Sequence, residues 1–176
     1  MAITTMTVKK GTSSGNFEPG WKKVSVKSAS YGSLDNGAKY IDVYFNEYPD
    51  TFNLRVYAKT NKDNEEFAIA NLFRFSNAGI EEVVKSQSDE SITNVKINDA
   101  ASGLVSKEMW IYLYKNQEGY SRVLQRIAPV EFEGELDKFN ENDVSYWKGK
   151  AEVYFKQWVE PNISSTVMQQ TDDAPF

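Results

Sequence analysis

Residues 39–58 read KYIDVYFNEYPDTFNLRVYA, and apolar side chains alternate with polar ones or tyrosines in both halves of this stretch. Ile41 and Val43 mark the apolar side of the first half, and Leu54 and Val56 mark that of the second half. A period of two is typical of a strand that buries one face, and the intervening YPD is a turn signal. The stretch therefore predicts two strands joined by a turn.

The pattern extends in both directions along the chain. Residues 21–30, WKKVSVKSAS, alternate around Val24 and Val26 and predict an earlier strand, which LDNG (34–37) separates from the next one. After the opening stretch, residues 65–84, EEFAIANLFRFSNAGIEEVV, place apolar side chains near helical spacing. We expect a helical insert here, which Gly79 could divide into two short helices.

The second half of the chain predicts a weak strand at residues 92–97, a hairpin and a terminal helix. Residues 108–127, EMWIYLYKNQEGYSRVLQRI, carry the strongest hairpin pattern, in which we expect Tyr114 to pair with Tyr120. Asn142 or Asp143 could cap the helix, and Pro161 would end it. The expected apolar side of this helix consists of Val144, Trp147, Ala151, Tyr154, Phe155 and Trp158.

The order of these elements predicts a mainly β protein with added helices. Three strands, a helical insert, a closing hairpin and a terminal helix match an OB-fold-like five-stranded Greek-key barrel, a fold that binds oligonucleotides and oligosaccharides. Several α+β folds share this order and remain open. We divide the chain into a flexible basic arm (1–20), an OB-like domain (21–160) and a linker with an acidic tip (161–176).

The composition excludes several kinds of chemistry, because the 176 residues include neither Cys nor His. Disulfides, zinc fingers, thiol nucleophiles and Ser-His-Asp triads are therefore absent. The glycines of GTSSGN (11–16) lack the Gly-Lys-Ser/Thr ending of a phosphate loop. Glu131, Glu133 and Glu135 could hold Mg²⁺, but a solvent-exposed strand edge is the favoured interpretation. We expect no enzyme, no cofactor and no bound metal.

Apolar content and its distribution indicate a soluble domain. With 40% apolar residues the chain has enough such side chains to bury a core. The apolar runs are too short to span a bilayer, and the first residues lack the regions of a secretory signal. We expect a cytoplasmic protein without membrane contact.

Charge is distributed unevenly, although the net charge is only −5. Residues 1–27 contain five lysines and a single carboxylate side chain, that of Glu18. The last 17 residues contain Glu160, Asp172 and Asp173 and no lysine or arginine. This asymmetry indicates a basic working surface and an acidic tail.

Aromatic side chains occupy the outer faces of the expected strands, where polar residues are the norm. Aromatic faces for bases and cations for phosphates are how proteins bind single-stranded nucleic acid without sequence preference. The alternative is that these rings pack under the helices or pair across strands. The predicted contacts with single-stranded DNA are Lys22, Lys23, Lys27, Tyr40, Tyr44, Arg55, Tyr57, Trp110, Tyr112, Tyr114, Tyr120 and Arg122.

The end of the chain, DDAPF (172–176), resembles the C-terminal tip of bacterial and phage single-stranded DNA-binding proteins. Asp172, Asp173, Pro175 and Phe176 carry the match. Residues 39–80 and the segment EGYSRVLQRIAP (118–129) are similar to the small phage-encoded versions. The resemblance implies a protein that coats single-stranded DNA during replication, recombination and repair, in the host cytoplasm if a phage encodes it. It also implies that the tip binds partner enzymes.

Other interpretations stay open at this point. A carbohydrate-binding module would also present tryptophan and tyrosine on strands, and a phage structural or assembly protein could use the same rings between subunits. The apolar side of the terminal helix fits either a cap on the barrel or a homodimer interface. A preference between DNA and RNA is equally open.

Overall fold

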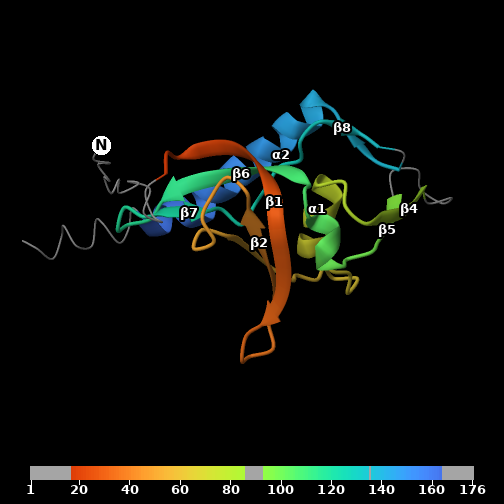
Figure 1. Ribbon diagram of the computed structural model, residues 1–176, viewed down its shortest axis with the longest axis horizontal. Helices are drawn as coiled ribbons and strands as arrows, with labels where there is room; N and C mark the ends of the chain where they lie inside the picture. Colours follow the sequence, from red (N-terminus) through yellow and green to blue (C-terminus); the bar gives the residue numbers. More distant parts are fainter. Residues whose placement is uncertain (1–16, 86–92, 135, 164–176) are drawn as a thin grey trace, which may run out of the picture.

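The computed structural model describes residues 17–85, 93–134 and 136–163, and their main feature is a five-stranded antiparallel sheet curled into a nearly closed barrel (Figure 1). The strand order is β3-β2-β1-β6-β7. The five strands are β1 (Gly20–Ser33), β2 (Lys39–Phe45), β3 (Leu54–Tyr57), β6 (Glu108–Lys115) and β7 (Ser121–Val123). This arrangement is consistent with an OB-like barrel with added helices, so the predicted fold class is confirmed.

The long strand β1 joins the two halves of the barrel. Its first half pairs with β6 and its second half pairs with β2, and the register shifts between Val26 and Ser28. A bulge of this kind bends a strand and increases its twist, which lets one strand serve both neighbours. The alternating apolar residues then point inward, and Val24, Ile41 and Ile111 are at most 1% exposed.

Helix α1 (Ala68–Phe75) packs against the barrel core with Ile69, Leu72 and Phe73 buried. The helix begins beside Glu66, whose carboxylate accepts hydrogen bonds from the backbone N–H groups of Ile69 and Ala70 at 2.8 and 2.9 Å. These are N–H groups of the first turn, which have no partner within the helix. The helical insert after the third strand therefore follows the prediction.

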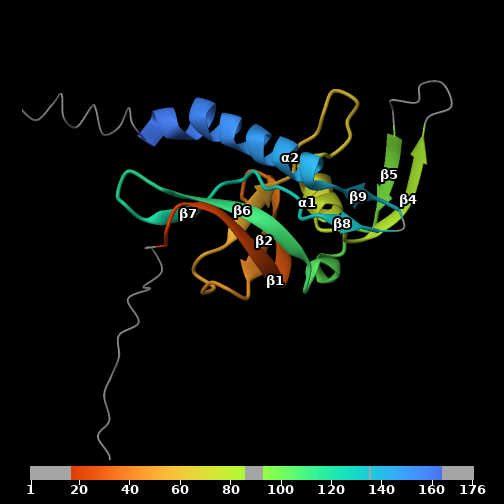
Figure 2. The ribbon, with the colours of Figure 1, turned by 90° about the horizontal axis from the view of Figure 1, so that it is seen from above.

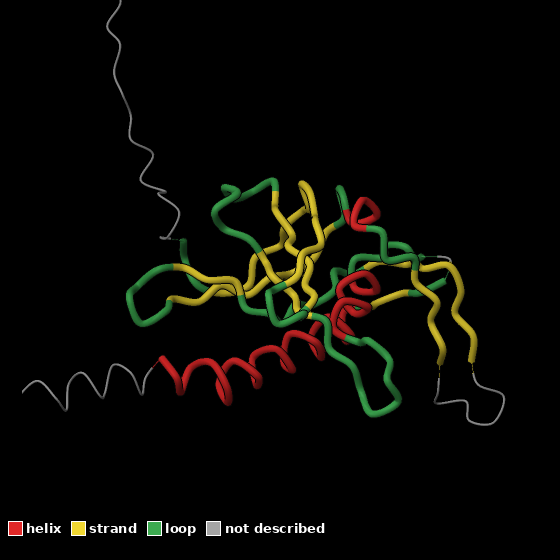
Figure 3. Tube along the Cα trace, turned by 90° about the horizontal axis from the view of Figure 1, so that it is seen from below, coloured by secondary structure: helices red, strands yellow, loops and turns green. Residues whose placement is uncertain are grey.

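The second half of the expected insert is a strand rather than a helix, so that part of the prediction is wrong. Strand β4 (Ile80–Lys85) pairs with β5 (Thr93–Ile97), and this hairpin projects from the barrel (Figures 2 and 3). Gly79 adopts φ +66°, and a Cβ there would lie 2.0 Å from the Asn98 carbonyl oxygen. Glycine alone fits this approach, and the strand begins directly after it with the β-branched Ile80 and continues through Val83.

Two small elements complete the described body. A 3₁₀ turn, η1 (Ala101–Leu104), precedes β6, and a short hairpin joins β8 (Phe132–Glu133) to β9 (Lys138–Phe139). Glu131 and Glu133 are exposed there, whereas Glu135 lies outside the described residues. Within the ranges that the structure describes, no cluster of three or more acidic side chains has the arrangement of a metal site.

Helix α2 (Glu141–Tyr154) begins and ends differently from the prediction. Its N-cap is Asn140 rather than Asn142 or Asp143, and Asn140 and Asp143 exchange two hydrogen bonds of 2.9 Å in a capping box. The helix continues through a π-helical turn, η2 (Phe155–Val159), and then as α-helix to residue 163. Pro161 therefore lies within the helix, because the chain widens to the π form just before the residue that lacks an N–H group.

Some residues that the prediction assigned to the arm and the linker lie in the described barrel and helix. The ring of Phe17 packs against Tyr48 and Phe52 at centroid distances of 4.9 and 5.0 Å, and its backbone exchanges hydrogen bonds with the Ser121 hydroxyl. Residues 17–20 therefore belong to the barrel rather than to a loose arm, and residues 161–163 belong to the helix rather than to a linker. The rest of both predicted segments lies outside the described residues.

Candidate nucleic-acid interface

A groove of about 640 Å³ lies where strand β3, the β6–β7 hairpin and the C-terminal part of the helix meet. Strands β3 and β7 are the two ends of the strand order, so this groove runs along the seam where the barrel nearly closes. The helix runs along the barrel toward the β6–β7 hairpin and provides the remaining wall (Figure 2). The lining includes Asn53, Arg55, Tyr114, Asn116, Arg122, Gln125, Tyr154, Trp158 and Asn162.

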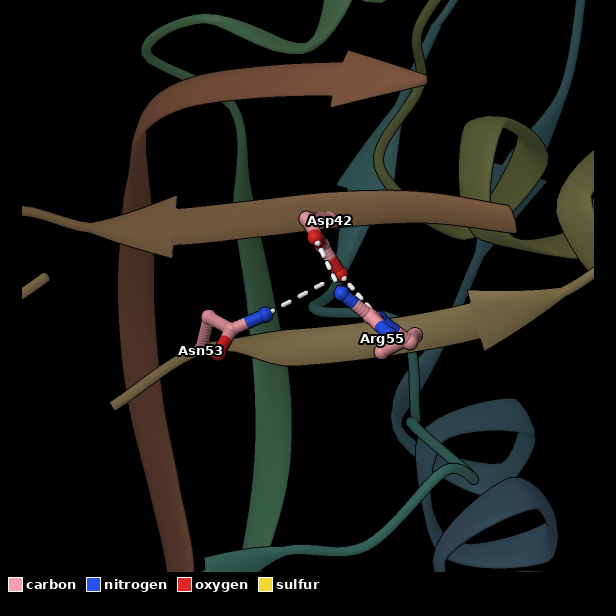
Figure 4. A network of polar contacts seen from close by, with 3 residues as sticks. All are labelled: Asp42, Asn53 and Arg55. Atoms are coloured by element: carbon pink, nitrogen blue, oxygen red, sulfur yellow. Dashed lines mark hydrogen bonds and ion pairs between the residues drawn. The ribbon is translucent and has the colours of Figure 1, made fainter. Parts of the chain in front are cut away.

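Arg55 is held in place by Asp42 on the neighbouring strand (Figure 4). Its Nε and Nη2 atoms donate to the two carboxylate oxygens at 2.7 and 2.9 Å, and the amide of Asn53 donates to the same carboxylate at 3.1 Å. Asp42 is 8% exposed beneath these partners. The hydrogen bond with Asp42, followed by one with Tyr57, raises the pKa of Arg55 above its ordinary value. The guanidinium is therefore charged and fixed in one orientation.

Tyrosine rings support this guanidinium. The Arg55 Cζ atom lies 3.8 Å from the centroid of the Tyr40 ring, and Tyr57 contacts Tyr40 edge-on at 5.8 Å. The Tyr40 ring rests on Gly32, where a Cβ atom would come within 2.6 Å of it. Tyr40 and Tyr57, two of the predicted contacts, thus lie beside Arg55, and Tyr40 acts as its support. Tyr44 lies on the same outer face of β2, opposite Ser28.

The β6–β7 hairpin brings Arg122 to the same groove, with a different register from the predicted one. Tyr114 pairs with Arg122 rather than with Tyr120. The Asn116 side chain accepts hydrogen bonds from the N–H groups of Glu118 and Tyr120, which closes the loop between residues 116 and 120. Because the two registers differ by two residues, every side chain keeps its predicted face. Arg122 is exposed, and its guanidinium lies 6.0 Å from the centroid of the half-exposed Tyr120 ring.

The outer-face rings of β6 pack under the helix. Phe155 contacts Tyr112 and Tyr114 at centroid distances of 5.3 and 5.4 Å, and the Lys148 ammonium lies 3.6 Å from the centroid of the Trp110 ring. Burial is the largest of the causes that raise the pKa values of Tyr112 and Tyr114. The alternative of packing under a helix therefore describes these three rings, although Tyr114 also reaches the groove.

The three predicted lysine contacts lie on β1 and are not brought to the groove. Lys27 forms an ion pair with Asp50 at 2.6 Å. Lys23 is exposed opposite Trp110, and Lys22 is half-buried opposite Ile111 on the other side of the strand. In the strand order β2 separates β1 from one wall of the groove, and β6 lies between β1 and β7 on the other side.

The most informative residue that sequence reasoning misplaced is Trp158. The helical period puts it on the apolar side that packs against the barrel, yet it is 66% exposed and lines the groove. Tyr154 and the amides of Asn53 and Asn162 also line the groove without having been predicted as contacts. Apolar periodicity does not show where a helix extends beyond the surface on which it packs. No pattern in the sequence therefore predicts that Trp158 is exposed while Ala151, on the same side of the helix, is buried.

No family model matches the chain, and no curated protein matches it. Among the described residues no helix is long and apolar enough to cross a membrane. The predicted tip residues Asp172, Asp173, Pro175 and Phe176 lie outside the described residues.

Proposed function

We propose that the protein binds single-stranded DNA without sequence specificity in the groove between β3, the β6–β7 hairpin and the end of the helix. The observation that carries this proposal is that Arg55 and Arg122 line one groove together with an exposed indole, that of Trp158. Cations for phosphates and open aromatic faces for bases are the two elements of sequence-independent single-strand binding.

The roles of the groove residues follow from their chemistry. Arg122 is exposed and suits a phosphate contact, whereas Arg55 presents a fixed guanidinium plane on which a base can stack. Trp158 offers a second stacking surface on the opposite wall. Glu118 also lines the groove, so we expect the phosphates beside Arg122 and away from this carboxylate.

The preference for single strands has a physical basis. The bases of a duplex are already stacked and paired, so the indole of Trp158 gains a stacking partner only from an unpaired base. The amides of Asn53 and Asn116 along the groove can donate to phosphate or base atoms of such a strand.

The wider biological role rests on the resemblance of the chain end. With Asp172, Asp173, Pro175 and Phe176 as a partner-binding tip, the protein would coat single-stranded DNA during phage replication or recombination and recruit enzymes. The negative charge of the tip suits basic pockets on such partners, and the ring of Phe176 suits an apolar socket within them.

The test is a titration of fluorescein-labelled oligo(dT) with the full chain, followed by fluorescence anisotropy at low and high salt. We expect tight binding at low salt that weakens severalfold when the salt rises fourfold, because each phosphate contact on a single strand releases counterions and contributes a factor of about 2.6. A duplex of equal length is the control and should bind far more weakly. Equal binding of single strand and duplex, or no binding at all, would contradict the proposal.

A further inference from the structure

A second groove lies between the two helices, next to the first one. Its volume is about 360 Å³, and it shares Gln125, Tyr154 and Trp158 with the groove along the barrel seam. Its walls come from α1, from α2 and from residues 125–127. Most of the lining is apolar and includes Val56, Phe67, Leu72, Phe75, Ile127 and Ala151.

Large apolar side chains at this groove remain in contact with water. Phe67 is 42% exposed on the α1 side, and Val153 is 50% exposed on the α2 side. Trp158, at 66%, lies between the two grooves. Single exposed apolar side chains are common on protein surfaces, but a cluster of them around one groove is typical of a binding surface.

The same groove carries positive charge without paired carboxylates. Arg126 and Lys150 line it, and within the described ranges neither forms an ion pair with a carboxylate. The Arg126 guanidinium lies over the Tyr154 ring at 4.0 Å. Burial, followed by the charge of Arg126, lowers the pKa of Lys59, so a third cation lies near the groove. Glu66 contacts the Lys59 backbone, but its carboxylate is occupied by N–H groups at the start of α1.

These features define the chemistry of an occupant. We propose that the groove between α1 and α2 binds an acidic peptide segment of a partner protein, with one aromatic or aliphatic side chain as its anchor. The apolar walls around Leu72 and Ile127 suit such a side chain, whereas a nucleobase would leave its polar edge unpaired there. Carboxylates beside the anchor would face Arg126 and Lys150, which is charge complementarity in a chain whose net charge is −5.

The experiment uses the full chain and a fluorescein-labelled hexapeptide of sequence TDDAPF, which has this chemistry and repeats residues 171–176. We expect saturable binding by fluorescence anisotropy that Lys150→Glu weakens by about tenfold or more, with no nucleic acid in the sample. The matched control is Lys96→Glu on β5, an exposed lysine far along the chain that should leave the affinity unchanged.

A second pair of variants tests the apolar part of the groove. Val153→Asp should weaken peptide binding, because Val153 lines the groove. Val84→Asp is the matched control and should leave peptide binding unchanged, since the two valines are similarly exposed, at 50% and 46%. A peptide with alanine in place of its phenylalanine should also bind weakly. Tighter peptide binding to a Phe176→Ala chain than to the natural chain would show that the chain's own end competes for the groove, which supports the site.

Two outcomes would overturn the inference. Equal losses of peptide affinity in Lys150→Glu and Lys96→Glu would show non-specific attraction. No saturable binding to either the natural or the Phe176→Ala chain would show that the groove takes no such peptide. Because the titration contains no nucleic acid, peptide binding can succeed or fail independently of the proposed function.

Discussion

Asp42 decides where the Arg55 guanidinium lies. A carboxylate that is 8% exposed and bonded at both oxygens leaves the arginine little freedom, because the planar fork matches the carboxylate at two points. Arginine carries five N–H donors, of which Asp42 takes two, so donors remain for a ligand. The pair thus keeps a cation in the groove without neutralising its hydrogen-bonding capacity.

The first prediction concerns Arg122. Arg122→Ala should weaken oligo(dT) binding by about tenfold. It should also make the plot of log affinity against log salt concentration less steep, by the amount expected for the loss of about one phosphate contact. The side chain is exposed, so the free energy of unfolding should change by less than about 0.5 kcal/mol. Anisotropy titrations at several salt concentrations measure both effects, and Lys96→Ala is the control. An unchanged salt dependence would remove Arg122 from the phosphate path.

The second prediction concerns Gly32, which supports the Tyr40 ring. A Cβ at position 32 would lie 2.6 Å from the outer atoms of that ring, so Gly32→Ala should displace Tyr40 and with it the plane of Arg55. We expect oligo(dT) affinity to fall by roughly threefold to tenfold, because a displaced guanidinium plane would lose only part of a stacking contact that contributes about 1–3 kcal/mol per base. Gly103→Ala is the control, since a Cβ at position 103 would have nothing within 4 Å of it. Identical affinities for the two variants would exclude this role.

At the scale of elements, helix α2 depends on its cap at Asn140. The Asn140 side chain accepts a hydrogen bond from the N–H group of Asp143 at 2.9 Å. Asn140→Ala should therefore lower the free energy of unfolding by about 1 kcal/mol. Asn142→Ala lies within the first turn and should have an effect close to zero, because alanine favours a helix. Urea denaturation compares them, and equal losses would contradict the assignment of the cap.

The β4–β5 hairpin depends on Gly79. Gly79→Ala combines a positive φ with a Cβ only 2.0 Å from the Asn98 oxygen, whereas Gly37→Ala has a positive φ and open space around it. We expect Gly37→Ala to cost about 1 kcal/mol of unfolding free energy and Gly79→Ala to cost at least about 1 kcal/mol more. Equal midpoints in urea denaturation would show that the close approach to Asn98 relaxes freely.

At the scale of the whole molecule, several half-buried tyrosines make stability sensitive to alkaline pH. Burial is the largest of the causes that raise the pKa of Tyr31 to about 12, and its hydroxyl donates to the Asp99 carbonyl oxygen at 2.7 Å. The folded protein thus holds this proton more tightly than the unfolded chain. Its contribution to stability is complete below about pH 10 and is lost as the pH rises toward 12.

We therefore expect the free energy of unfolding to fall between pH 9.5 and about 11.5 in urea titrations, and to fall less in Tyr31→Phe. That variant should start lower at pH 9.5, because it lacks the hydrogen bond to Asp99. Lys59 and Lys148, whose pKa values burial lowers, act in the opposite direction, so the comparison with Tyr31→Phe isolates the tyrosine. Parallel curves for the two proteins would contradict the assignment.

The groove is also a property of the whole molecule. It exists because the strand order places β3 and β7 at the two ends of a nearly closed sheet, and because the helix returns along the barrel to their seam. Asn53 and Trp158 are 105 residues apart in the sequence, and they line one groove only because the barrel nearly closes and the helix returns to its seam. Such a site has no local sequence pattern.

The sequence by itself determined the barrel strands and the faces of their side chains. Alternation around Ile41, Leu54 and Ile111 reports which face is buried, because the period of two is a local property of a strand. The sequence also predicted a break at Gly79. It did not predict that a strand rather than a helix follows this glycine, since Ile80 and Val83 fit the period of either element over so short a run.

Only the tertiary structure decided which outer faces are covered. The aromatic residues of β6 and β2 have the same alternating pattern in sequence. In the structure, however, Tyr112 packs under Phe155, whereas the Tyr40 ring contacts the Arg55 guanidinium. The register of Tyr114 with Arg122 depended on the Asn116 side chain, and the exposure of Trp158 depended on where the helix leaves the barrel. Periodicity specifies a buried side of each element, whereas the partner that covers the other side is set by contacts between residues distant in the chain.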